Sequence, residues 1–165
     1  MQRPVARRRA APLRGAPSQA NLDLEMVARA QPVIERLRAA GIQPSAQRVA
    51  VASYVLATDE HPSAERVWTV VKRTLPVISR ATVYNTLNLL VRHGLLHELV
   101  LAPGRTVFDP KLERHHHFVD DDTGRIIDVP WDAIAVGEPR GLPGLAVREY
   151  QVVMRGRQRT ARARR

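Results

Sequence analysis

Residues 79–109, SRATVYNTLNLLVRHGLLHELVLAPGRTVFD, change from a helical to a strand-like pattern. Ser79 can cap a helix, because its hydroxyl can accept a hydrogen bond from a free N–H of the first turn. Gly94 can end that helix, since glycine readily adopts the left-handed conformation that closes many helices. The apolar positions that recur at the helical period are Val83, Leu87 and Leu90. The two apolar runs around Pro103 and Gly104 then predict a hairpin.

The residues before this segment, 23–78, carry a helical pattern. Pro32 suits the first turn of a helix that ends at Gly41. Ser45 and Ser63 can cap two further helices. The residues expected to face inward are Val49, Ala52 and Leu56 in the first of these, and Ala64, Val67, Trp68 and Val71 in the second. Short helices followed directly by a hairpin predict a winged helix-turn-helix domain.

The second half of the chain contains short strand-like pieces. They are HHHFV, GRIIDV and LAVREYQVVM, within residues 115–154. Proline and glycine are frequent in residues 130–144, which leaves room for only a short helix near 131–136. The expected fold class is α+β, an N-terminal winged-helix domain joined to a small C-terminal α/β domain. The expected boundaries are a disordered tail at 1–22, the winged helix at 23–110, the second domain at 111–154 and a basic tail at 155–165.

The formal net charge of +10 comes from the two tails. Residues 1–22 contain five Arg, residues 155–165 contain six Arg, and neither segment contains an acidic residue. Such tails either attract polyanions without sequence preference or are solvated segments with no specific role. Nucleic acid is therefore a candidate partner, but the folded part of the chain must recognise it.

The composition excludes several classes of protein. The chain has no Cys, which excludes disulfides, Cys-ligated zinc and iron–sulfur clusters. No apolar run approaches the roughly 20 residues of a membrane span. The Arg-rich start lacks the apolar core of a secretory signal. We therefore expect a cytoplasmic protein with no membrane partner.

The second face of the helix at 79–94 is polar. It presents Tyr84, Asn88 and Arg92 every four residues, with Asn85 beside them and Arg80 in the first turn. Arg, Asn and Tyr are side chains that meet bases and phosphates when a helix enters the major groove. An ordinary solvated face has the same pattern. The hairpin after the helix favours DNA binding, because Arg105 near its tip could reach a flanking phosphate.

The triplet of His115, His116 and His117 suggests a metal site. In a strand, residues i and i+2 point the same way, so His115 and His117 share a face and His116 points away. Asp109 precedes the triplet and Asp128 lies in a neighbouring strand, and carboxylates beside imidazoles favour Fe(II) or Mn(II) over zinc. His61 could join this group only if the two domains pack together. The alternative is a polar strand face without a metal.

These motifs resemble the ferric uptake regulator (Fur) family of metal-dependent repressors. The resemblance covers residues 34–155 and rests on GIQPSAQRVAV, EHPSAERVW, ISRATVYNTLNLLVRHGLL, RTVFD, HHHF and TGRIIDV. It implies a homodimer that binds an inverted-repeat operator in double-stranded DNA, with residues 111–154 as a metal-binding dimerisation domain. It also implies a transcriptional repressor and not an enzyme, with a regulatory metal at the domain junction.

The resemblance also implies roles for individual residues. The regulatory ligands it implies are His61, Asp109, His115, His117 and Asp128. It places DNA contacts on Arg48 and Tyr84, to which the polar face of the helix adds Arg80, Asn85 and Asn88.

Two branches of the family remain open. Both expected carboxylate ligands are Asp, which is similar to the peroxide-sensing, PerR-type branch. In that branch Fe(II) reacts with hydrogen peroxide and a ligand histidine is oxidised, which would make His61 and His115 the oxidised residues. The alternative is the iron-response regulator (Irr) branch, which shares ATVYNTLN and the HHH motif and responds to haem. The expected cofactor is Fe(II) or Mn(II), with haem only under this alternative.

The sequence departs from the common family pattern at its cysteines. TGRIID stands where many members have one of the two Cys pairs that hold a structural zinc, so we expect no such zinc here. Dimerisation must then rest on strand pairing and apolar packing, with residues 145–154 as candidates. Arg114 stands where a further regulatory site would need a ligand, so we expect no second metal. His93 and His97 are expected to be structural or surface residues.

Two other functions fit part of the pattern. A non-haem metalloenzyme could use His115, His117 and a carboxylate as a facial triad, but no motif supplies a substrate pocket. A nucleic-acid binder without sequence preference could rely on the Arg tails alone, which predicts binding that is indifferent to metal.

Overall fold

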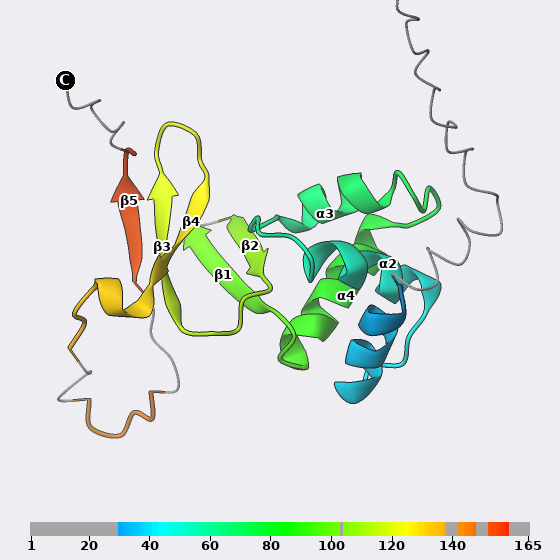
Figure 1. The fold of residues 1–165 in the computed structure, drawn as a ribbon, viewed down its shortest axis with the longest axis horizontal. Coiled ribbons are helices and arrows are strands. Elements are labelled where there is room, and N and C mark those ends of the chain that lie inside the picture. The colour runs from blue at the N-terminus through cyan, green and yellow to red at the C-terminus, as the bar shows by residue number, and fades with distance from the viewer. Residues whose placement is uncertain (1–29, 103, 138–141, 148–151, 159–165) are drawn as a thin grey trace, which may run out of the picture.

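The computed structural model describes residues 30–102, 104–137, 142–147 and 152–158. The predicted tail at 1–22 and residues 159–165 of the predicted basic tail lie outside these ranges. The elements are a helix at 30–39, α2 (Ala46–Val55), α3 (Ala64–Val71), α4 (Arg80–Arg92), β1 (His97–Ala102), β2 (Arg105–Asp109), β3 (His115–Asp120), β4 (Ile126–Pro130) and β5 (Val153–Gly156). The helices form one end of the molecule and β3, β4 and β5 form the other, with the hairpin β1–β2 between them (Figure 1).

The predicted helix starts and the predicted stop of α4 are confirmed. The hydroxyls of Ser45, Ser63 and Ser79 each accept a hydrogen bond from the backbone N–H three residues later, at 3.3, 3.2 and 3.0 Å. Gly94 adopts φ 68° directly after His93, the C-cap of α4. Each of these signals is local, since the capping atoms belong to the helix end that they satisfy.

The helices enclose the main hydrophobic core. Val83, Leu87 and Leu90 of α4 are fully buried in it, as predicted. The prediction for α2 was partly wrong, because Val51, Ala52 and Val55 are its buried residues, while Val49 and Leu56 are only partly buried. The reason is that α2 packs against both α3 and α4, so its buried face is set by two neighbours and not by its own period alone.

The hairpin β1–β2 is packed on both faces. Phe108 points into the helical core, whereas its neighbour Val107 points the opposite way. Val107 joins a second core, which consists of Leu99, Leu101, Val107 and Val119, the last of these from β3. Arg105 was expected to reach a phosphate, but its Nη2 donates to the carbonyl of Gly124 at 2.7 Å. The hairpin is therefore docked on the C-terminal sheet.

The C-terminal sheet has the strand order β4-β3-β5, with β4 antiparallel and β5 parallel to β3. The helix expected near 131–136 is a single 3-10 turn, Trp131–Ala133. Residues 145–147, expected in the last strand, are not part of it, since the described strand begins at Val153. The expected α+β class is confirmed. Within the described ranges, no helix has both the length and the apolar character needed to cross a membrane.

Candidate metal centre

Strand β3 places two imidazoles on one face. His115 and His117 lie two residues apart, and their Nε2 atoms are 2.9 Å from each other. The Nδ1 of His115 contacts the carbonyl of Glu113 at 2.7 Å, which orients the ring. His116 points to the opposite face, where it is fully buried and stacks on Trp131 at 4.4 Å between ring centroids. The predicted alternation of the three histidines is confirmed.

Two carboxylates approach these imidazoles from neighbouring strands. Asp128 of β4 is the register partner of His117, and its Oδ1 lies 3.6 Å from the Nε2 of His115. Asp109 ends β2, and its Oδ2 lies 2.9 Å from the Nε2 of His115 and 3.4 Å from that of His117. Both Asp residues therefore present one oxygen to the histidine pair.

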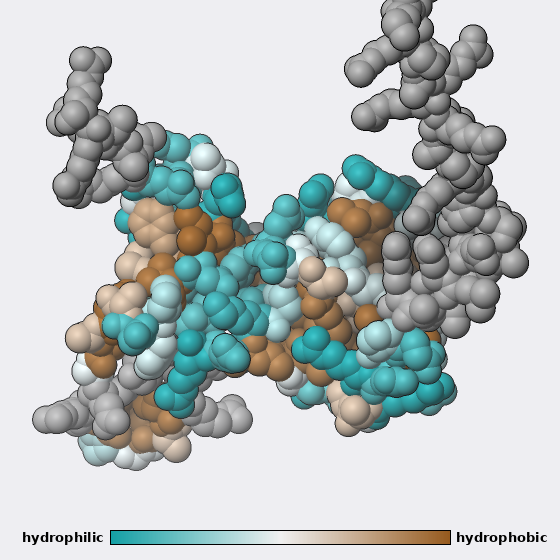
Figure 2. All heavy atoms as spheres, viewed as in Figure 1, coloured by the Kyte–Doolittle hydropathy of each residue, from teal (hydrophilic) through white to brown (hydrophobic). Residues whose placement is uncertain are grey.

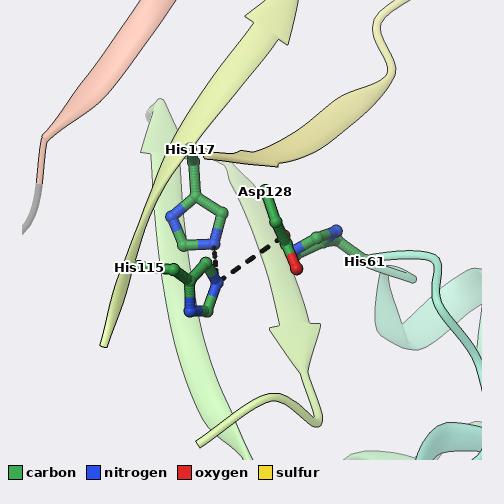
Figure 3. A group of neighbouring side chains, drawn as sticks. All are labelled: His61, His115, His117 and Asp128. Atoms are coloured by element: carbon green, nitrogen blue, oxygen red, sulfur yellow. Dashed lines mark hydrogen bonds and ion pairs between the residues drawn. The ribbon is translucent and has the colours of Figure 1, made fainter. Parts of the chain in front are cut away.

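His61 reaches the same point from the helical half of the chain (Figure 3). It lies two residues before Ser63, the N-cap of α3, and the next residue, Pro62, accepts a backbone hydrogen bond from Phe108 of β2 at 3.0 Å. The Nε2 of His61 lies 3.0 Å from Asp128 Oδ1 and 3.7 Å from Asp109 Oδ2. The condition set for His61, that the two halves pack together, is met in this structure.

The resulting donor set fits a divalent cation. One ligand atom from each of His61, His115, His117 and Asp128 lies within 4.8 Å of all the others. The Nε2 of His61, the Oδ2 of Asp109 and the Oδ1 of Asp128 are buried and have no hydrogen-bond partner. Buried polar atoms without partners are costly, and a cation among them would remove that cost. Imidazole nitrogens combined with carboxylate oxygens suit Fe(II), Mn(II) or zinc.

The charge on Asp109 suits this role. Burial raises the pKa of this carboxyl group, but the imidazoles of His117 and His61 and the backbone N–H of Lys111 outweigh burial and hold the pKa well below its ordinary value. Asp109 is therefore an anion at neutral pH, as a metal ligand must be.

A pocket of about 280 Å³ opens beside the cluster. Its walls come from both halves of the chain and are Leu56, Ala57, Thr58, Asp59, His61, Asp109, Pro110, Lys111 and Asp128. A small solute can thus approach the carboxylates and His61 from solvent.

The predicted DNA-reading face is accessible on α4. Tyr84 is 46% exposed, and Asn85 and Asn88 are also exposed. Arg48 is half-buried, and its Nη1 donates to the carbonyl of Gln43 at 2.8 Å. Figure 2 shows both hydrophilic and apolar residues on the helical end of the molecule.

Arg80 has a partner that the sequence did not reveal. Its guanidinium pairs with Glu65 of α3, with Nη2 2.9 Å from Oε1, and this hydrogen bond raises the pKa of Arg80. The same group lies over the ring of Trp68, 4.1 Å from the centroid. Because Glu65 and Arg80 are fifteen residues apart, no local pattern indicates this pairing. His93, expected to be structural, contacts the carbonyl of Ala40 through Nδ1 at 2.7 Å.

Together, the helices, the docked hairpin and the cluster at the junction define a winged-helix protein with a candidate metal centre between its two halves. The model of the ferric uptake regulator family matches residues 39–153. The chain belongs to this family, whose members are metal-responsive transcriptional regulators.

Similar proteins include both peroxide and iron regulators. The chain is 33% identical over 95 residues to the peroxide-responsive repressor PerR of Staphylococcus aureus (strain Mu50 / ATCC 700699), a match that covers 58% of this chain and 64% of that protein. The matched part is thus less than two thirds of that relative. The ferric uptake regulator of Pseudomonas aeruginosa with manganese has a TM-score of 0.60 at 25% identity, over 78% of this chain and 98% of that one. The ferric uptake regulator of Vibrio cholerae has the same fold, with a TM-score of 0.60 at 24% identity, over 76% of this chain and 98% of that one.

Proposed function

We propose that this protein is a metal-dependent transcriptional repressor that senses hydrogen peroxide. The observation that carries the proposal is the convergence of His61, from the helical half, with Asp109, His115, His117 and Asp128 at the domain junction. A cation held by this set ties the start of α3 to the C-terminal sheet. Because α3 packs directly on α4, the cation would also set the position of Tyr84 relative to the C-terminal sheet.

The peroxide signal is supported by the donor set and by the open pocket. His61, Asp109, His115, His117 and Asp128 would hold Fe(II), which when bound would supply the electrons that cleave the O–O bond of hydrogen peroxide. His61 lines the pocket and His115 lies in the middle of the cluster, and the resemblance to the peroxide-sensing branch makes these two imidazoles the expected sites of oxidation. Oxidation of either ring weakens it as a ligand, which releases the metal and ends repression.

The test is operator binding under anaerobic conditions with Fe(II) and with Mn(II), each measured before and after a pulse of hydrogen peroxide. We expect the Fe(II) protein to lose its affinity for the operator and the Mn(II) protein to keep it. Release of the DNA on addition of haem would instead support the Irr-like alternative, provided that peroxide oxidises no histidine in the Fe(II) protein.

We infer that the active form is a homodimer on an inverted repeat. The region before β5 carries exposed apolar side chains, namely Leu142, Leu145 and Val147, and these could bury surface between two copies. Two copies related by a two-fold axis would present two α4 helices to two half-sites, so we expect the operator to be an inverted repeat.

Tyr84→Ala is expected to weaken operator binding by about 1–3 kcal/mol, the usual cost of losing a base contact. The phenol is exposed on the outer face of α4, so its removal leaves the helical core intact. Competition titrations with the operator and with random DNA measure the effect. Equal losses on both DNAs would show that Tyr84 only positions the backbone.

Removal of the basic tails is expected to flatten the salt dependence of DNA binding while preserving the operator preference. Residues 1–20 and 159–165 can be deleted, whereas Arg155 and Gly156 belong to β5 and must stay. The logarithm of the binding constant falls as the logarithm of the salt concentration rises, and each lost phosphate contact makes this slope less steep by about 0.9. Binding isotherms at several salt concentrations give this slope. If the preference for the operator vanished with the tails, α4 would not be the main reader of sequence.

A further inference from the structure

Lys111 contacts both carboxylates of the metal centre. Its backbone N–H donates to Asp109 Oδ1 at 2.8 Å, and its Nζ donates to Asp128 Oδ2 at 3.2 Å. The other carboxylate oxygens, Asp109 Oδ2 and Asp128 Oδ1, face the histidines. Both are buried, and neither accepts a hydrogen bond. Lys111 therefore contacts one oxygen of each carboxylate, and the other oxygen of each faces the histidines.

We propose that Lys111 is a positioning residue that makes Asp109 and Asp128 bind the metal through one oxygen each. This inference rests on the proposed function, since it assumes that the cluster binds a cation. A carboxylate can bind a cation through one oxygen or through two. With Lys111 in place, the donors that face the centre are three Nε2 atoms, Asp109 Oδ2 and Asp128 Oδ1. The side of the cluster that borders the pocket then stays open to a solute.

The ion pair of Lys111 with Asp128 is the part that a substitution can remove. The side chain of Lys111 is 44% exposed and that of Asp128 is 30% exposed, so loss of the ammonium leaves no cavity in the core. In Lys111→Met, Asp128 Oδ2 loses its partner and is free to turn towards the metal. The substitution also removes a positive charge close to the site, and both changes favour binding of a cation.

The chain offers a matched control, because Lys72 and Lys111 are the only two lysines in the sequence. Lys72 is exposed at the end of α3, where its Nζ lies over the ring of Trp68, 4.6 Å from the centroid. Lys72→Met removes the same charge from a position outside the cluster and the pocket. Lys111→Arg retains a donor at the site itself and is the rescue variant.

The experiment compares the full chain with Lys111→Met, Lys111→Arg and Lys72→Met after loading each with Co(II). Co(II) with five ligands absorbs visible light more strongly than Co(II) with six, because its site is less symmetric. We expect weaker visible absorption in Lys111→Met, since Asp128 adds a second oxygen, and unchanged absorption in Lys111→Arg and Lys72→Met. Mn(II) titration is expected to show binding about tenfold tighter in Lys111→Met alone, from the removed charge and the added donor.

A Lys111→Met protein with the Co(II) spectrum of the unaltered chain would overturn the role of Lys111, whatever its Mn(II) affinity. Failure of the proposed function has a different signature. An unaltered chain that takes up neither Co(II) nor Mn(II) would overturn both the metal centre and the positioning role.

Discussion

His115→Ala is expected to abolish metal-dependent DNA binding while leaving a folded chain. The Nε2 of His115 lies 2.9 Å from His117 Nε2 and 2.9 Å from Asp109 Oδ2, so its loss removes the donor at the middle of the cluster. We expect Mn(II) binding to weaken by more than about 100-fold, since removal of a residue that merely orients a ligand can already cost that much. Calorimetric titration with Mn(II) and operator binding by fluorescence anisotropy measure the two effects.

Asp59→Ala is the matched control for this prediction. Asp59 lines the same pocket but is exposed and lies outside the donor set. It should change the Mn(II) affinity and the operator affinity far less than His115→Ala does, because it removes a nearby charge but no ligand. A double variant, His115→Ala with His117→Ala, should lose little more than either single variant, because ligands of one ion act as a unit. Metal-dependent repression that survives in the double variant would rule out this site.

Mild peroxide treatment of the Fe(II) protein is expected to oxidise one histidine and to release the operator in parallel. An oxidant formed at a metal in this cluster would lie next to His61 and His115, so it would meet these imidazoles before it reaches bulk solvent. Mass spectrometry should show the addition of one oxygen atom to the peptide that holds His61 or His115. The extent of this modification should follow the loss of operator affinity measured on the same samples.

Two controls separate peroxide sensing from general damage. The Mn(II) protein should show neither the modification nor the loss of affinity, because Mn(II) reacts poorly with hydrogen peroxide. Asp128→Glu should keep metal-dependent DNA binding but reduce the oxidation, since the longer side chain can fill the open side of the cluster. Oxidation of His93 and His97 to the same extent as His61 and His115 in the Fe(II) protein would count against a metal-directed reaction.

The features that were predictable from sequence are those that depend on neighbours along the chain. Ser79 caps α4 through an N–H only three residues away, and Gly94 ends it through its own backbone conformation. The common face of His115 and His117 follows from the alternation of a strand. Asp109 and Asp128 were predicted as candidates from their residue type beside these imidazoles, and the structure places both of them at the histidine pair.

The features that local patterns do not indicate depend on packing between distant segments, and His61 was predicted as a ligand only through the resemblance to the family. The approach of His61 to Asp128 requires the hairpin β1–β2 to dock on β3, and no local pattern encodes that contact. The pairing of Arg80 with Glu65 is set by the way α3 packs on α4. Lys111 was missed for another reason: its backbone N–H makes half of the contact, and a backbone group leaves no trace in residue type.

The burial of β1–β2 on both faces has a consequence for how the chain unfolds. Phe108 belongs to the helical core and its neighbour Val107 to the core shared with β3, so a single strand carries side chains of both. Neither half can unfold without exposing apolar surface of the other half to water. Unfolding one half alone would gain chain entropy, but that gain would have to offset the free-energy cost of this exposure. The two halves should therefore melt in one cooperative transition, and an ion at their junction would raise the temperature of the whole transition by mass action.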